Sequence, residues 1–151
     1  MTVSPPDAPY VSVELYAQVQ EFYARQMNLL DGSTADPVAW SRTFTEDAVL
    51  GSNFQDAPDT GQPAILRSMR EALAHIAAQG TGDFRHWLAM LDVQPQADGS
   101  VRTRYYGLAM ATPPGGSLRI RGHVLCHDEL VRRAGRWLVR RRHLEADGVP
   151  A

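Results

Sequence analysis

Histidine is the residue type that offers this chain most acid–base chemistry, because the pKa of an imidazole lies close to neutral pH. His86, His123 and His127 all fall in segments with the sequence pattern of β-strands. All fifteen basic residues are arginine, which excludes Schiff-base or nucleophilic chemistry by a lysine amine. With a single cysteine, Cys126, the composition leaves His, Tyr and Asp to move protons.

His86 stands near the start of a predicted strand over residues 84–93. Alternation along a strand places Phe84, His86, Leu88 and Met90 on one face. A histidine among apolar neighbours could serve as a general acid or base. The alternative is a structural histidine that is hydrogen-bonded within the core.

Tyr105 and Tyr106 are adjacent in the next predicted strand, so their side chains must point to opposite faces. Tyr106 shares its face with Leu108 and Met110. Its hydroxyl could donate a hydrogen bond to a carbonyl or enolate oxygen of a ligand. The alternative is an aromatic side chain that only fills the core.

His123 and His127 share one face of a later strand, and Asp128 points to the other, which disfavours a His127–Asp128 dyad. Only Glu129 adds a carboxylate to the face of the two histidines. Ligands spaced in this way along a strand lie too far apart for one metal ion, so we expect no metal site. His127 is the second acid–base candidate.

The elements that must position these side chains change from helical to extended along the chain. In the first half, apolar residues recur every three or four positions. In the second half, apolar and polar residues alternate within segments that are separated by tight glycine turns. Segregated helices and antiparallel strands predict an α+β fold, with a strongly bent sheet wrapped around the helices. We expect helices over 13–30, 37–44 and 64–78, and strands over 48–51, 84–93, 101–112, 118–132 and 136–144.

A bent sheet over helices would enclose a conical, mostly apolar pocket suited to a flat polycyclic ligand. The alternative for each residue that could line it is a place in the core. The residues that we expect to line the pocket are Tyr23, Met27, Trp40, Phe54, Met69, Leu88, Met110 and His123.

The chain of 151 residues has the length of one domain, which we place at 13–146 between tails at 1–12 and 147–151. A net charge of −2 argues against nucleic acid as a partner. No apolar run reaches the length of a membrane span, and the N-terminus lacks the features of a signal peptide. We therefore expect a cytoplasmic protein without a membrane partner.

Three segments together resemble the SnoaL-like branch of the nuclear-transport-factor-like superfamily, whose fold is a cone-shaped α+β barrel. They are EFYARQMNLLDG…WSRTFTEDAVL (21–50), FRHWLAML (84–91) and GHVLCHDELVRRAGRWLVRRR (122–142). The resemblance extends over about residues 13–145. Within this family, the sequence is most similar to cyclase/dehydratase-type proteins of actinomycete aromatic polyketide pathways.

The resemblance implies a cofactor-independent enzyme that binds an aromatic polyketide and forms a homodimer. His86 matches the strand-start histidine of scytalone dehydratase, and Asp31 matches the aspartate that orients it. From the residues alone, Asp31 would be a turn or cap residue. Tyr106 stands about where that enzyme has a second histidine, and His127 about where it has a pocket amide.

Other functions remain open within the superfamily. The first segment is also similar to the small subunits of ring-hydroxylating dioxygenases, which would make the chain a non-catalytic binding or structural subunit. Epoxide opening or isomerisation in the same pocket is a further alternative. The arginines at 132–133 and 140–142 form a basic last hairpin, of which at most half can point into the cone.

Overall fold

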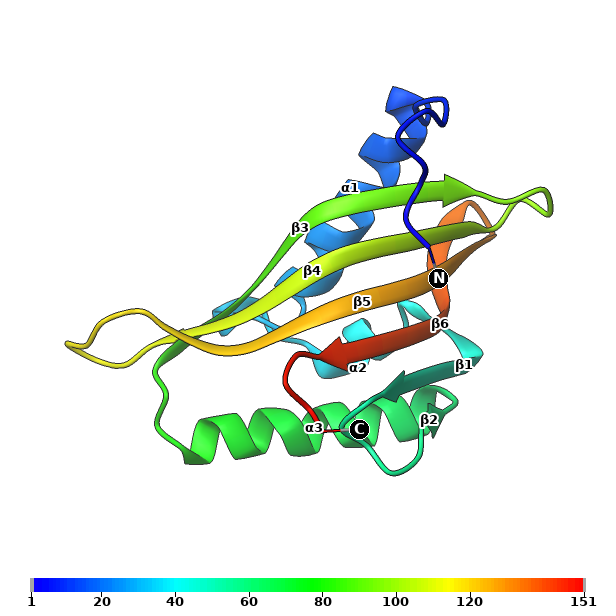
Figure 1. Ribbon diagram of the computed structural model, residues 1–151. Coiled ribbons are helices and arrows are strands. Elements are labelled where there is room, and N and C mark those ends of the chain that lie inside the picture. The colour runs from blue at the N-terminus through cyan, green and yellow to red at the C-terminus, as the bar shows by residue number, and fades with distance from the viewer. Residues whose placement is uncertain (1, 151) are drawn as a thin grey trace.

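The computed structural model describes residues 2–150 and arranges one strongly bent sheet with helices on one side (Figure 1). This confirms the predicted α+β class. The elements are α1 (Val13–Asn28), the 3-10 helix η1 (Gly32–Thr34), α2 (Pro37–Ser41), β1 (Phe44–Ser52), β2 (Asp59–Thr60), α3 (Gln62–Ala78), β3 (Asp83–Pro95), β4 (Val101–Thr112), β5 (Arg119–Arg133) and β6 (Arg136–Ala146).

The six strands lie in the order β2-β1-β6-β5-β4-β3, and the sheet does not close. All neighbours are antiparallel except β1 and β6, which are parallel. Glycines with positive φ form the tight turns between the long strands, as at Gly99 and Gly135. The mostly antiparallel sheet that the sequence predicts is confirmed.

The second helix and the first strand differ from their predicted bounds. Asp36 caps α2 as its sequence indicates, since its carboxylate accepts the backbone N–H of Ala39 at 2.9 Å. The helix ends at Ser41, however, and Phe44 already belongs to β1. Phe44 is buried with its ring centroid 4.8 Å from that of Trp40. Packing and the pairing of β1 with β6 thus override the local helical pattern.

Among the described residues the strand pairings contain four register shifts, of which two lie in β3, β4 and β5 near His86. Between Ala89 and Asp92 the register of β3 shifts, and Met90 has a φ of 54°. Met90 is 71% exposed at this bulge, and it still belongs to the lining of the space between α1 and β3. A second shift lies opposite Ala109 and Met110, next to Gly122, where the sequence indicates a bulge or bend.

We call the face of the sheet toward α1 the inner face and the opposite one the outer face. The core lies on the inner side, between the sheet and the helices. Residues 2–12 cross the outer face, in front of β3, β4 and β5 in Figure 1. There the backbone N–H of Ser4 donates to Asp92 at 3.0 Å, and the side chain of Gln94 donates to the carbonyl of Thr2 at 2.8 Å.

The ends of the chain at Met1 and Ala151 lie outside the described residues. Within residues 2–150, no helix combines the length and apolar character needed to cross a membrane.

Candidate active site

The end of α1 and the start of β3 bring Asp31 and His86 into direct contact. Asp31 Oδ1 lies 2.7 Å from His86 Nδ1, and Asp31 Oδ2 accepts the backbone N–H of His86 at 2.9 Å. One carboxylate therefore fixes both the strand and the imidazole of the same residue. The contact that the family resemblance implies is present, with the Asp31 side chain 9% and the His86 side chain 26% exposed.

This geometry assigns the two ring nitrogens different roles. An ionised carboxylate only accepts hydrogen bonds, so Nδ1 of His86 must carry a proton in this pair. In the neutral imidazole, Nε2 then holds the lone pair and can accept a proton from a ligand. The orientation by a carboxylate is the arrangement found where an imidazole must act as a base.

A short loop holds Asp31 in place after α1 has ended. The hydroxyl of Thr34 donates to the carbonyl of Asp31 at 2.9 Å and to that of Asn28 at 2.5 Å. The backbone N–H of Asp36 donates to the carbonyl of Leu29 at 2.8 Å. These bonds tie the loop to the last turn of α1 and keep the carboxylate directed at β3.

The inner face of the sheet beside His86 carries small side chains. His86 pairs with Ala109 on β4, and Ala109 pairs with Gly122 on β5. In the next row, Leu88 pairs with Gly107. Paired residues share a face, so the imidazole has small neighbours on β4 and β5, whereas on its own strand the centroid of the Phe84 ring lies 5.3 Å from that of the imidazole.

An apolar groove of about 250 Å³ lies between α1 and β3, and Asp31 and His86 are not among its lining residues. Two lining residues are close to the pair in the sequence, since Met27 stands four residues before Asp31 and Leu88 stands two residues, or about 7 Å, along the strand from His86. We define this α1–β3 groove by its lining residues, which are Tyr16, Gln20, Tyr23, Ala24, Met27, Leu88, Ala89, Met90, Leu91 and Tyr105.

Behind the α1–β3 groove lies a buried polar network centred on Asp128. Arg142 donates to both carboxylate oxygens of Asp128, from Nε at 2.9 Å and from Nη2 at 2.7 Å. The hydroxyls of Tyr23 and Tyr105 donate to Oδ2 of Asp128 at 2.8 and 3.1 Å. The Tyr23 hydroxyl also lies 2.5 Å from that of Thr103.

The network fixes the protonation of its members. Burial, together with the Asp128 carboxylate, raises the pKa of Tyr23 and Tyr105 well above its usual value, so both stay neutral donors. Burial opposes the charge of Arg142, but the Asp128 carboxylate outweighs it and raises the pKa of the guanidinium. Burial also raises the pKa of the neighbouring Cys126 thiol to about 12, which removes it as a nucleophile.

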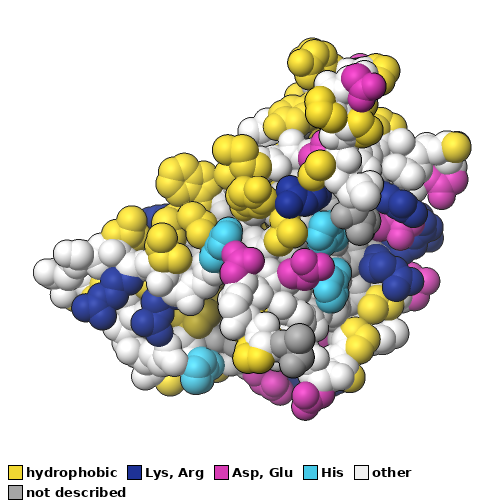
Figure 2. All heavy atoms as spheres, viewed as in Figure 1, with side chains coloured by type: hydrophobic (Ala, Val, Ile, Leu, Met, Phe, Trp, Pro, Cys, Tyr) yellow, Lys and Arg dark blue, Asp and Glu magenta, His cyan; other side chains and the backbone are white. Residues whose placement is uncertain are grey.

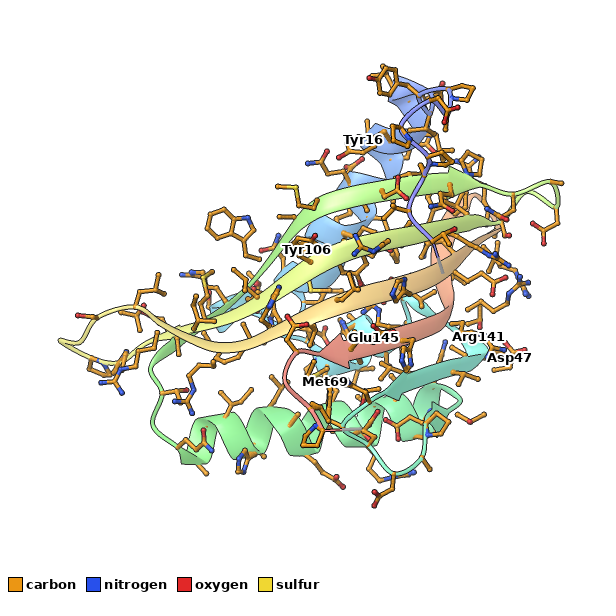
Figure 3. The ribbon with its side chains drawn as sticks, in the orientation of Figure 1. Tyr16, Asp47, Met69, Tyr106, Arg141 and Glu145 are labelled. Carbon is orange, nitrogen blue, oxygen red and sulfur yellow. The ribbon has the colours of Figure 1, made fainter. Side chains whose placement is uncertain are left out.

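The two adjacent tyrosines occupy opposite faces, as alternation requires, but Tyr105 rather than Tyr106 faces inward. Tyr106 lies on the outer face of β4, where its ring centroid is 6.1 Å from that of His123 (Figure 3). Met110 shares this face, opposite Ile120. Tyr106, Met110 and His123 are therefore not brought to the α1–β3 groove.

His127 also lies on the outer face, opposite Arg104 on β4 and His143 on β6. Its side chain is buried, and Nδ1 has no hydrogen-bond partner among the described residues. Burial lowers the pKa of His127, and the nearby Glu145 offsets this only in part. Its place on the far side of the sheet separates it from His86, contrary to its predicted role beside the ligand.

The remaining predicted pocket residues divide between groove, core and surface. Tyr23, Met27 and Leu88 line the α1–β3 groove. Trp40 is fully buried in the core, and Met69 packs against the core from α3. Phe54 is exposed in the loop after β1.

Sequence reasoning missed Arg142 and Gln26 as partners of Asp128. Arg142 Nη2 donates to the Gln26 side-chain carbonyl at 2.7 Å, and both residues are buried. A glutamine on the apolar face of the first helix was the available signal. Among residues 2–150, no group of three or more His, Cys, Asp and Glu side chains has an arrangement that could hold a metal ion.

The chain matches a known domain family and several solved structures. The model of the SnoaL-like domain matches residues 11–143. Aln2 from a Streptomyces species is 32% identical with a TM-score of 0.81, covering 92% of this chain and 95% of its own. ActVI-ORFA from Streptomyces coelicolor is 29% identical with a TM-score of 0.82, covering 93% and 100%.

A third similar structure is from Catenulispora acidiphila and was solved in complex with S-DNPA. It is 33% identical, with a TM-score of 0.75, and the match covers 90% of this chain and 96% of that one. No curated protein matches the sequence. Because the domain model spans most of the chain and the first of these structures is over 30% identical across nearly its whole length, the protein belongs to the SnoaL-like family.

Proposed function

We propose that the protein is a cofactor-independent cyclase or dehydratase that works by general acid–base catalysis on an aromatic polyketide intermediate. The observation that carries the proposal is the Asp31–His86 pair, and an apolar groove lies between the same strand, β3, and helix α1. The substrate class is supported by the family resemblance, by the Streptomyces relatives and by the relative that binds S-DNPA.

In the proposed reaction, Nε2 of His86 removes a proton from a carbon next to a ligand carbonyl, and Asp31 stabilises the imidazolium that forms. The electron pair of the broken C–H bond moves toward the carbonyl oxygen to give an enolate. In a dehydration, the enolate expels a β-hydroxyl, which leaves as water with the proton from His86. In a cyclisation, the enolate carbon attacks a second carbonyl, whose oxygen takes that proton.

The test uses β-hydroxy-α-tetralone, a bicyclic aromatic ketone whose loss of water gives a naphthol. We expect the protein to accelerate naphthol formation and to exchange the protons beside the carbonyl for deuterium in D₂O. His86→Gln removes the base and should lower both rates by about 10²–10⁴-fold. His123→Gln is the matched control on the outer face and should keep both rates.

Equal activity of His86→Gln and the wild-type protein would refute the proposal, as would equal losses in both variants. Exchange without loss of water would retain His86 as the base and favour an isomerase or cyclase over a dehydratase.

We also propose that the outer face of the sheet joins two copies of the chain. Trp87, Tyr106, Leu118 and Ile120 are exposed there, and Figure 2 shows the apolar side chains gathered over this part of the sheet. The adjacent rim has mixed charge, which suits a twofold axis because each copy then supplies both partners. Its pairs are His123 with Asp147, and Glu145 with His127 and His143.

Sedimentation equilibrium tests the dimer. We expect the wild-type protein to have twice the mass of the 16.7 kDa chain and the variant Trp87→Ser/Ile120→Ser to be monomeric. Tyr10→Ser removes an exposed aromatic ring from the N-terminal segment and should leave the mass unchanged. A wild-type monomer at tens of micromolar concentration would contradict this assignment.

A further inference from the structure

The basic last hairpin of the sequence takes no part in the Asp31–His86 site, and it forms one wall of a second hollow. This arginine groove lies on the other side of α1 from the α1–β3 groove, between α1, the end of α2 and the β5–β6 turn. We define it by Arg25, Arg42, Arg132 and Arg136 with the rings of Phe22 and Trp137. We propose that it binds a small organic anion, a phosphate or carboxylate attached to a flat apolar body.

The charge of the groove is the first argument. Four arginines line it, and Glu21, the one carboxylate in its lining, pairs with Arg25. Within residues 2–150, no carboxylate lies within salt-bridge distance of Arg42, Arg132 or Arg136. The groove is thus strongly positive in a chain whose net charge is −2. A bound anion would relieve the repulsion among these guanidinium groups.

The chemistry of arginine limits the class of ligand that this groove can bind. A guanidinium presents a planar set of donors that matches the oxygens of a carboxylate or phosphate in pairs. Arg42 follows α2, and Arg136 begins β6, so the two approach the groove from different elements.

The second argument is that aromatic side chains in the wall are already oriented. The Arg132 guanidinium lies 4.9 Å from the centroid of the Trp137 ring, in a cation–π contact. Gln18 accepts from Arg132 at 2.7 Å and from the indole N–H of Trp137 at 3.3 Å. These contacts hold Trp137 beside the hollow, where a flat ligand body can lie against its edge and against Phe22.

The size of the groove favours a small ligand. Its volume of about 650 Å³ falls in the range of small-molecule sites, roughly 300–1,000 Å³. Its polar base is ordered, because the buried Gln26 donates to the Thr43 hydroxyl at 2.6 Å and accepts from Arg142. A concave site with an ordered base suits a molecule that enters it better than it suits a flat acidic protein surface.

Calorimetric titration with phenyl phosphate tests the proposal. We expect saturable binding that weakens with salt and that phenol, the uncharged analogue, does not reproduce. Arg42→Gln/Arg136→Gln should weaken binding by about tenfold or more, since charge-assisted hydrogen bonds contribute at least that factor. Arg67→Gln/Arg70→Gln removes the same charge from exposed positions of α3 and should bind as the wild-type protein does.

The ligand class is tested by a hexaglutamate peptide in the same assay. Peptide binding that depends on Arg42 and Arg136 without phenyl phosphate binding would overturn the proposal in favour of an acidic protein partner. Equal losses in both arginine double variants, or no binding of phenyl phosphate at about 10 mM, would also overturn it. His86→Gln should keep the affinity for phenyl phosphate, so this site can stand or fall independently of the proposed catalysis.

Discussion

The imidazole of His86 is bound at Nδ1 by Asp31, and only Nε2 remains for a ligand. Asp31→Asn keeps the size of the side chain but lets an amide NH₂ face Nδ1, which favours the tautomer with its proton on Nε2. We expect kcat for β-hydroxy-α-tetralone to fall about 10–100-fold with little change in KM. Steady-state kinetics measures this, with far-UV circular dichroism as the check that the variant is folded.

Asp36→Asn is the matched control for this substitution, because it changes a nearby aspartate that caps α2 and still offers an oxygen acceptor. It should retain the kcat of the wild-type protein. A similar loss in both variants would mean that the Asp31 effect comes from the loop and not from the imidazole.

His127 gives the folded protein a pH dependence of its own. Burial lowers its pKa in the folded state, so the unfolded chain binds more protons between that lowered pKa and about 6.5. Stability from this group is therefore complete above the unfolded pKa and is lost as the pH falls through the window below it. The test compares pH 7.5 with pH 5.5, which lie about one unit above and below the unfolded pKa of about 6.5. His127→Gln should reduce the difference in the free energy of unfolding between these two pH values, as measured by urea titration. An unchanged difference would assign the acid sensitivity to other groups.

At the scale of elements, the start of β3 is fixed by a glycine that no other residue can replace. Gly82 has a φ of 77°, and a Cβ there would lie 2.2 Å from the carbonyl oxygen of Thr112. Gly80 has a similar φ of 59° but open space around it. Gly80→Ala should cost about 1–2 kcal/mol from backbone strain alone, and Gly82→Ala about 3 kcal/mol or more because β3 and β4 must separate.

Urea unfolding of the two variants measures this difference, and Gly82→Ala should also lower the proposed activity by shifting His86. Equal costs for both substitutions would show that β3 is free to move at its start.

Helices and hairpins follow from the sequence because their patterns are local. The apolar spacing in α1 and α3 and the glycine turns at Gly99 and Gly135 locate the elements within a few residues. The bulge at Met90 has no such signal, since methionine rarely adopts a positive φ and only the pairing with β4 imposes it.

A local sequence pattern does not determine which face of a strand points toward the helices. Alternation correctly separates Tyr105 from Tyr106, but β4 carries apolar side chains on both faces, and the choice of the inner one depends on α1. For the same reason, the sequence pattern predicts Met110 and His127 on the pocket side, whereas the structure places both on the outer face. Asp31 and His86, by contrast, are paired through the family resemblance, since 55 positions separate them in the sequence.

At the scale of the whole molecule, Asp128 and Arg142 connect the helical layer with the sheet. Their bidentate pair is buried on β5 and β6, and it continues to Tyr23 and Gln26 on α1 and to Tyr105 on β4. Four elements thus share one set of hydrogen bonds. No single segment of the sequence shows this, because each residue alone resembles an ordinary core or surface position.

Arg142→Met should be strongly destabilising because it leaves the Asp128 carboxylate buried without a cation, at a cost of about 3–5 kcal/mol. Asp128→Asn/Arg142→Met removes both charges, so its loss in the free energy of unfolding should be clearly smaller than the sum of the two single losses. Arg141→Met changes the exposed neighbour on β6 and should cost less than about 1 kcal/mol. Chemical denaturation of the wild-type protein, Asp128→Asn, Arg142→Met and the double variant measures the coupling, with Arg141→Met as the control. Additive losses would mean that the two charges are stabilised separately, and the network would then not hold α1 to the sheet as a unit.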